Sequence, residues 1–274
     1  MNRWYSLGQS AAKAALRYRV ERGLGFDEPC DVFETVADEN IDLQFVDIPS
    51  LEGMFLHEPE ARRICVCALR PWGRQRFTAA HELGHYVLGH GTQVDTTIEC
   101  REDAGFSDEE ILADGFARFL LMPPRAVGRV VCSEQHSPEA IFHASCWLGV
   151  GYETLIRQMC STLRLISGTD QDRLLRSKPR ELCKKIARDQ SFSCDAWPLD
   201  GYWRDRLLHL QVGDIAEGVI AKGSQVLSPT SPTAALATAA GTEVVQLAAG
   251  GTVTISVSRR SYVGFYDYRY LPEC

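Results

Sequence analysis

Two histidines and a glutamate in the segment HELGH could bind a metal ion and use it for catalysis. His81 and His85 stand four residues apart, so on a helix their side chains lie only about 40° apart around the axis and project side by side. Two imidazoles placed in this way can share one zinc ion. Glu82 follows His81 directly, and its carboxylate can take a proton from water, as the H-E-x-x-H mechanism requires. The spacing predicts a zinc peptidase with Glu82 as catalytic residue; the alternative is two histidines on a helix surface.

A third protein ligand is expected from the acidic segment DEEILADGFARFLLMP. A catalytic zinc of the His₂Glu type needs a carboxylate from another element and keeps its fourth position open. Glu110 and Asp114 are four residues apart and share one helix face. We expect Glu110 to bind the metal and Asp114 to hold a zinc-bound imidazole through its free N–H. Glu109, about 100° away, is the alternative ligand, and His90, beyond Gly89, is expected to face solvent. Manganese or iron would suit the same ligands.

The helices that would carry these residues have recognisable ends. The pattern is helical from 74 to 88, and Gly89 is a typical helix terminator. The acidic helix begins after Ser107, a suitable N-cap, and ends at Met122, because Pro123 restricts the residue before it. The two helices are therefore expected to bring a His pair and a carboxylate together.

Helices and strands are also expected before the HELGH segment. Helical spacing of apolar residues predicts helices over 9–22 and 29–38, and the segments 41–48, 53–57 and 62–69 are predicted as a strand followed by a hairpin. We expect the last of these, RRICVCAL, to be the sheet edge that holds an extended substrate by backbone pairing.

The second half of the chain changes character. Residues 137–166 have the outline of a helix-turn-helix around Gly149, and strand-like segments follow Trp197 around a Ser/Pro/Thr/Ala-rich loop. We predict an α+β fold: a metallopeptidase domain over 1–130, a helical, helix-turn-helix-like subdomain over 131–195 and a β-rich domain over 196–274. The alternative function is a DNA-binding regulator with a structural or regulatory zinc. The helix after Gly149 offers few side chains that read bases, so we do not expect the chain to bind nucleic acid directly.

The composition of the chain argues against several classes of protein. The net charge is −7 with a pI of about 5.5, which disfavours a general nucleic-acid binder. Between Arg173 and Arg188, however, seven basic residues stand against Glu181 alone; this run is either a solvated helix face or a surface for a polyanion or acidic partner. No apolar run is long enough to cross a bilayer, and ten scattered cysteines without an export signal indicate reduced thiols in a cytoplasmic protein.

The segment RQRFTAAHELGHYVLGH, followed by E-x-x-x-D-x-x-A-x-x-L-L-M-P, resembles the ImmA/IrrE family of bacterial metallopeptidases. The family pattern is R-F-T-x-A-H-E-x-x-H, then a Glu four residues before an Asn, then F-A-x-x-L-L-M-P. The positions that fit are Arg76, Phe77, Thr78, Ala80, His81, Glu82, His85, Glu110, Phe116, Ala117, Leu120, Leu121, Met122 and Pro123. Asp114 stands where Asn is usual and still offers an acceptor.

This resemblance implies more than the residues do alone. It implies a zincin-like domain with an HExxH helix and a gluzincin-like His₂Glu zinc site. It also implies a dedicated substrate: a transcriptional repressor of the Xre, helix-turn-helix type, cut in a stress or mobile-element response. Relatives resembling IrrE carry a sensory, GAF-like C-terminal domain, to which the β-rich segment would correspond. Since all expected ligands precede residue 115, a chain without residues 200–274 is expected to keep its metal.

Overall fold

The computed structural model describes residues 3–58, 61–96, 107–131, 136–187 and 195–271 of the chain, and these form two compact units. The first unit comprises Met1–His136, Leu148–Gln171 and Val263–Tyr266, and the second comprises Ser137–Trp147, Asp172–Tyr262 and Asp267–Cys274. The first unit therefore receives a short segment from near the C-terminal end of the sequence. The three-domain division expected above remains a prediction, since compactness alone does not say which part folds by itself.

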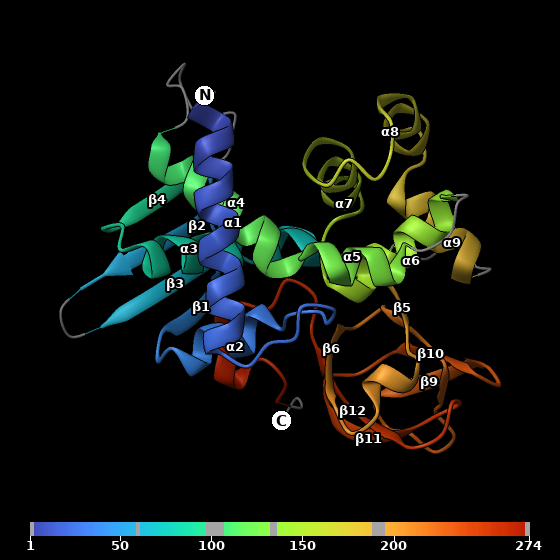
Figure 1. The fold of residues 1–274 in the computed structure, drawn as a ribbon. Helices are drawn as coiled ribbons and strands as arrows, with labels where there is room; N and C mark the ends of the chain where they lie inside the picture. Colours follow the sequence, from blue (N-terminus) through green and yellow to red (C-terminus); the bar gives the residue numbers. More distant parts are fainter. Residues whose placement is uncertain (1–2, 59–60, 97–106, 132–135, 188–194, 272–274) are drawn as a thin grey trace. The chain divides into compact units, whose positions relative to one another are not determined.

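The first unit contains one five-stranded sheet with helices packed against it (Figure 1). Its helices are α1 (Arg3–Glu21), α2 (Val32–Asp38), α3 (Trp72–Leu88), α4 (Asp108–Leu121), α5 (Pro124–Val130) and α7 (Tyr152–Arg157), which continues as a π-helical turn over Gln158–Thr162. Its strands are β1 (Asp42–Val46), β2 (Leu51–His57), β3 (Arg62–Cys67), β4 (Gln93–Thr96) and β13 (Gly264–Phe265). The predicted strand, hairpin and helices are all present, with α2 capped by Asp31.

The order of the strands corrects one expectation. The sheet runs β13-β1-β3-β2-β4, with β3 parallel to β1 and antiparallel to β2. β3, the RRICVCAL strand, is therefore interior and has no free edge for a substrate. Its last four residues are buried, as expected for a strand with neighbours on both sides. Within the described part of the first unit, the edge strands are β4 and β13.

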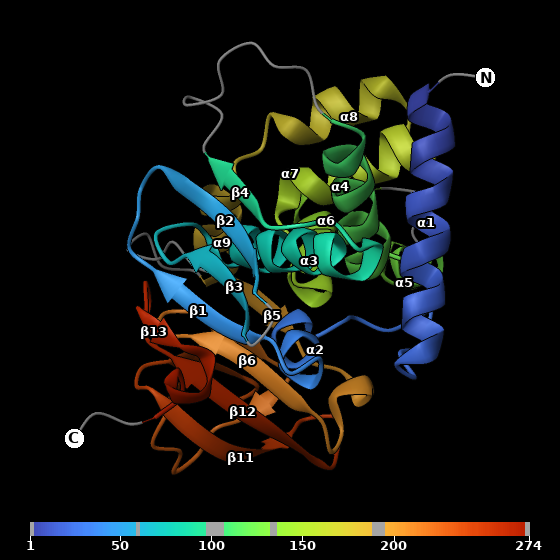
Figure 2. The ribbon, with the colours of Figure 1, turned by 90° about the vertical axis from the view of Figure 1, so that its left-hand side faces the viewer.

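Helix α3 lies against β2 and β3 and also packs against α4, while α4 packs against α1 (Figure 2). Two glycines allow these helices to approach closely. A Cβ at Gly84 would lie 3.2 Å from the Cα of Ala113 on α4, and one at Gly115 would lie 2.6 Å from the Cβ of Ala11 on α1. The helix carrying HELGH is thus held between a sheet and a second helix, which positions side chains on α3 and α4 toward one another.

The C-terminal segment closes the other edge of this sheet. β13 pairs antiparallel with β1, and Tyr266, which follows it, is 7% exposed. The Tyr266 hydroxyl donates to Glu34 Oε1 at 2.6 Å, and its ring centroid lies 5.9 Å from that of Phe33. Phe33 in turn contacts Trp72, the first residue of α3, with ring centroids 5.0 Å apart. A truncation at residue 200 would therefore remove a strand and a core aromatic from the unit that contains HELGH.

Tyr266→Ala is expected to lower the free energy of unfolding by about 3 kcal/mol, because a buried aromatic ring and its packing are lost. Tyr266→Phe, which loses only the hydrogen bond to Glu34, should cost about 1 kcal/mol. Urea unfolding of both variants measures this. The matched control is Tyr268→Ala, since that ring is 61% exposed; an equal loss from Tyr268→Ala would contradict the packing described here.

The second unit is dominated by two four-stranded sheets, with the orders β5-β7-β10-β9 and β6-β12-β11-β8. These strands are β5 (Ala196–Pro198), β6 (Leu207–Gln211), β7 (Ile215–Glu217), β8 (Val219–Ile220), β9 (Leu227–Ser231), β10 (Ala234–Ala237), β11 (Gly241–Leu247) and β12 (Thr252–Ser258). A short 3₁₀ turn covers Gly201–Trp203, and a second one, Tyr266–Tyr268, begins at the last residue of the first unit. The β-rich character expected after Trp197 is present, and the GAF-like interpretation stays a prediction.

The helices of the second unit are α6 (Pro138–Leu148), α9 (Pro179–Ala187) and the second half of α8 (Gly168–Leu175). α6 is fixed to the second unit by an ion pair between His143 Nε2 and Glu217 Oε2 at 2.9 Å. α6 and α7, the helices expected to form a helix-turn-helix, are separated by Gly149 with φ 67° and fall in different units. The helix-turn-helix therefore remains a prediction.

Two general expectations can be compared with the described residues. Among the described helices, none combines the length and apolar character that a membrane-spanning segment needs. The cysteines that are described are free thiols, namely Cys30, Cys65, Cys67, Cys146, Cys160 and Cys183.

Candidate metal centre

The HELGH residues lie in the last two turns of α3. The helix ends at Gly89, whose φ of 74° is left-handed and suits glycine. His81, Glu82 and His85 are all buried, and Glu82 and His85 are both 0% exposed. Ionisable groups are seldom buried so completely unless partners or a metal compensate for the loss of water. The sequence expectation of two surface histidines is therefore excluded.

The start of α4 places Glu110 opposite this pair. Ser107 caps the helix, and its hydroxyl accepts from the Glu110 backbone N–H at 3.2 Å. This cap fixes the first turn, so that Glu110 faces α3 at the point where Gly84 lets α3 and α4 come close. Glu109 points elsewhere: its Oε2 accepts from Gln93 Nε2 at 3.2 Å. Of the two candidate carboxylates, the structure brings Glu110 to the histidines.

Three ligand atoms converge at this point. His81 Nε2 and His85 Nε2 are 3.0 Å apart, and each lies 3.5 Å from a carboxylate oxygen of Glu110. A tetrahedral zinc ion with ligand atoms about 2.0–2.1 Å away holds those atoms about 3.3 Å from one another. The spacing fits such an ion without rearrangement of the helices, and these three residues form a group that could hold a metal ion.

His90 supports one of the imidazoles. The left-handed Gly89 folds the chain back, so that the His90 N–H donates to the His85 carbonyl at 2.9 Å and the two Nδ1 atoms lie 2.8 Å apart. Burial lowers the pKa of His90, which favours its neutral form. The expected solvent-facing position of His90 is thus not observed. The signal in the sequence was Gly89, since a helix end of this type returns the next residue onto the last turn.

Asp114 does not reach an imidazole. Its Oδ2 accepts from Arg118 Nε at 2.8 Å, one turn further along α4. The (i, i+4) pairing on the helix surface satisfies the carboxylate locally, and the Nδ1 position of His85 is taken by His90. The supporting role expected of Asp114 therefore passes to His90 in the structure.

Replacing His90 by Ala is expected to weaken metal binding by about 10–100-fold, the range typical of groups that orient a metal-binding histidine. Asp114→Ala should weaken metal binding less than about threefold, because among the described residues the polar contact of Asp114 is with Arg118 on the same helix. Competition with a chromogenic chelator measures both affinities. A larger loss from Asp114→Ala than from His90→Ala would contradict this assignment.

A glycine on the neighbouring strand holds Glu82 in place. A Cβ at Gly53 on β2 would come far inside van der Waals contact with Glu82 Oε1 and with Thr78 Cγ2. The backbone of β2 therefore lies directly against the Glu82 carboxylate, and only glycine leaves room for it. Sequence reasoning missed Gly53, because nothing in GMFLH indicates which strand lies above the helix.

Gly53→Ala is expected to reduce peptidase activity by about 100-fold while metal content is unchanged, because the added methyl displaces Glu82 from its position. The three atoms nearest to the added methyl belong to Glu82 and Thr78, and none belongs to a candidate ligand. Activity and bound metal should be measured on the same preparation. Gly8→Ala, where no atom lies within 4 Å of the added methyl, is the control, and equal activity of the two variants would refute the crowding of Glu82.

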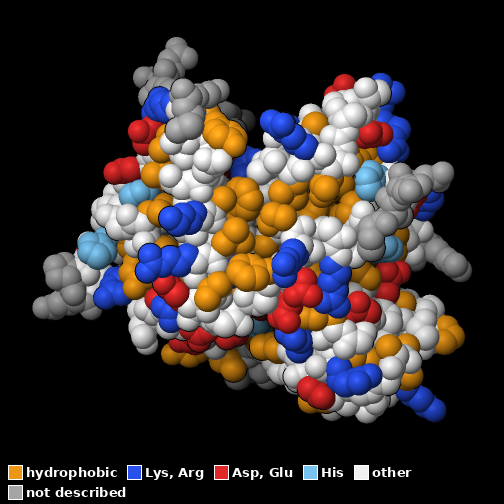
Figure 3. Space-filling model, in the orientation of Figure 1, with side chains coloured by type: hydrophobic (Ala, Val, Ile, Leu, Met, Phe, Trp, Pro, Cys, Tyr) orange, Lys and Arg blue, Asp and Glu red, His pale blue; other side chains and the backbone are white. Residues whose placement is uncertain are grey.

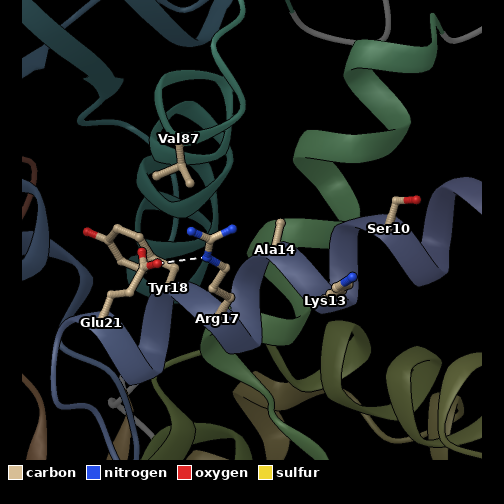
Figure 4. A pocket seen from close by; sticks show the side chains of 7 residues that line it. All are labelled: Ser10, Lys13, Ala14, Arg17, Tyr18, Glu21 and Val87. Atoms are coloured by element: carbon tan, nitrogen blue, oxygen red, sulfur yellow. Dashed lines mark hydrogen bonds and ion pairs between the residues drawn. The ribbon is translucent and has the colours of Figure 1, made fainter.

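A hollow of about 450 Å³ elsewhere in the first unit is distinct from this centre (Figure 4). It is lined by Ser10, Lys13, Ala14, Arg17, Tyr18 and Glu21 of α1 and by Val87 of α3. An ion pair between Arg17 Nε and Glu21 Oε1 at 2.7 Å lies along it. None of His81, Glu82, His85 or Glu110 lines the hollow, so it adds nothing to the metal group.

Comparisons with known proteins agree with the site. Residues 32–137 match the family model Peptidase_M78, described as the IrrE N-terminal-like domain. No curated protein matches the chain. Among solved structures, a Mycobacterium tuberculosis transcriptional regulator is similar at 16% identity with a TM-score of 0.35, over 58% of this chain and 52% of that chain. The chain thus spans about half the length of that regulator. Through residues 32–137, which include HELGH and Glu110, the chain carries a Peptidase_M78 domain, and this family indicates a metallopeptidase that uses a divalent metal ion.

Proposed function

We propose that the chain is a zinc-dependent endopeptidase in which His81, His85 and Glu110 bind the metal and Glu82 is the general base. The observation that carries this proposal is the convergence of three ligand atoms from two helices, all within 4.8 Å of one another. A structural zinc has no need of a general base, whereas here a buried glutamate stands beside the ligands. This feature favours a peptidase over a regulator with a structural zinc.

The chain's own groups divide the work of hydrolysis. Zinc bound at these ligands would act as a Lewis acid and lower the pKa of water toward neutrality. Glu82 accepts the proton of the attacking water and afterwards donates it to the leaving amine. Because Gly53 has no side chain, the Glu82 carboxylate has room beside β2. His90 keeps the His85 ring oriented.

The substrate would bind along β4 rather than along β3. β4 pairs with β2 on one side, with Val94 opposite Met54, and no strand in the described part of the chain pairs with its other side. Val94 is 56% exposed. An extended peptide can add to such an edge through backbone hydrogen bonds. Pairing of this kind selects little by sequence, so a dedicated substrate would have to be chosen by contacts outside the scissile segment.

The proposed substrate is a transcriptional repressor of the Xre type, cleaved in a stress or mobile-element response in the cytoplasm. The support is the resemblance of residues 76–123 to the ImmA/IrrE family, whose members cut one dedicated repressor. A protease of this kind should have weak activity on casein and on short peptides. These substrates can pair with the edge strand but lack the contacts outside the scissile segment that select the repressor.

Co-expression with the Xre-like repressor encoded beside the gene tests this substrate. The repressor should be cut at one bond by the wild type after stress and should stay whole with Glu82→Gln under every condition. If the protein digested casein rapidly and left the repressor intact, it would be a general peptidase and not an enzyme dedicated to one repressor. Cleavage by Glu82→Gln at the wild-type rate would instead refute the assignment of the base.

A further inference from the structure

The basic segment noted in the sequence forms an exposed surface on two short helices of the second unit. Residues 172–187 include the end of α8, a three-residue connection and α9. Arg176, Lys178 and Arg180 are all exposed, and within the described residues no ion pair is recorded for any of the three. In Figure 3, Lys and Arg side chains gather where Figure 1 labels α8. The surface therefore holds several cations that are not neutralised locally.

Helix α9 is anchored by its other face. Leu182 and Cys183 are buried, and the helix packs against β5. On a helix, Arg180 and Lys184 lie about 40° apart, whereas Leu182 is about 160° away from Lys184. Lys185 is held by an ion pair with Glu139 of α6. Arg180 is thus exposed and Lys184 half-buried on a helix whose apolar side is fixed to the rest of the unit.

Apart from its two arginines, the surface lacks the side chains that protein interfaces normally use. Protein interfaces depend on apolar and aromatic side chains near their centre and are depleted in lysine. The exposed large apolar residues of the described chain do not include any between 168 and 187. Affinity at this surface must therefore come from charge, and the matching ligand is one with closely spaced, regular negative charges. A nucleic-acid backbone has this property.

We propose that the α8–α9 surface, defined by Arg176, Lys178, Arg180 and Lys184, binds the phosphate backbone of duplex DNA. The major groove of B-form DNA admits a helix such as α9, whereas the deep, narrow major groove of duplex RNA does not. α9 has no Asn or Gln that would read adenine, so binding has little sequence preference. This activity goes beyond the proposed peptidase and concerns a different segment from the helix after Gly149 considered above.

The test is fluorescence anisotropy of a labelled duplex DNA of mixed sequence with the full-length protein at several salt concentrations. The wild type should bind at low salt and lose affinity steeply as salt rises. The triple variant Arg176→Gln, Lys178→Gln, Arg180→Gln should bind about tenfold or more weakly. Its slope of log affinity against log salt should fall by about 0.9 for each cation removed.

A control of equal charge separates this surface from the net charge of the molecule. Lys13→Gln, Arg125→Gln and Lys222→Gln also remove three exposed cations, and this variant should bind DNA within about twofold of the wild type. Circular dichroism checks that both variants are folded. No binding by the wild type at low salt, or equal losses in the two variants, would overturn the proposal. Equal affinity for duplex RNA, or stronger competition by polyglutamate than by DNA at equal charge, would overturn the assignment to DNA.

Discussion

A Glu82→Gln variant should keep its full metal content and lose peptide hydrolysis by about 10²–10⁴-fold, the range attributed to a positioned general base. The amide preserves the size of the side chain and its hydrogen-bonding capacity but cannot take a proton from water. Glu82 is buried against Gly53 of β2, so no other carboxylate can enter its place. Repressor cleavage and metal analysis on the same protein preparation give both values.

The matched control for Glu82→Gln is Glu109→Gln, the same chemical change at a carboxylate that contacts Gln93 outside the metal group. It should cleave at the wild-type rate. Wild-type activity in Glu82→Gln would exclude Glu82 as the base, and loss of metal from this variant would make Glu82 a ligand instead.

Glu110→Ala should weaken metal binding by more than about 100-fold, because residues that only orient a ligand already cost about 10–100-fold. The two carboxylate oxygens of Glu110 each lie 3.5 Å from one imidazole. Removing Glu110 therefore leaves the metal with only the two proposed histidine ligands. Glu109→Ala should bind metal with the wild-type affinity. Chelator competition measures the affinities, and the rise in melting temperature on adding zinc provides an independent measurement, since ligand binding stabilises the folded state.

The comparison of Glu110→Ala with Glu109→Ala also tests the register of α4. The Ser107 cap fixes where the helix begins, and a shift of one residue would turn Glu109 toward α3. A ranking with Glu109 above Glu110 would therefore refute the register and not only the ligand. His85→Ala should behave like Glu110→Ala, and a full zinc complement in that variant would exclude the whole group.

The features that could be predicted from the sequence are those set by local spacing. Two histidines four residues apart share a helix face whatever surrounds them, and the Ser107 cap fixes the face of Glu110 within one helix. The supporting residues could not be predicted in this way. His90 depends on a reversal of the chain at Gly89, and Gly53 depends on which strand lies over α3.

The wrong expectation for β3 has the same origin. The hairpin of β2 and β3 was predicted from local pattern, but β3 has no free edge because β1 pairs with its other side, and the edge beyond β2 is formed by β4. β4 is a four-residue strand, QVDT, too short and polar to indicate a partner. Likewise, the pairing of Gln44 with Phe265 joins residues more than two hundred positions apart, which no local pattern reveals.

That pairing has a consequence for the order of folding. The sheet of the first unit cannot be completed until the ribosome has passed residues 172–262, the largest segment of the second unit, because β13 is synthesised after them. Contacts between such distant residues form late, since the closure of a long loop must precede them. During synthesis, the helix that carries HELGH therefore waits for the aromatic contact that Tyr266 makes with Phe33. A chain assembled in this order gains its last strand only when residues 3–263 have been synthesised, so the complete sheet forms near the end of synthesis.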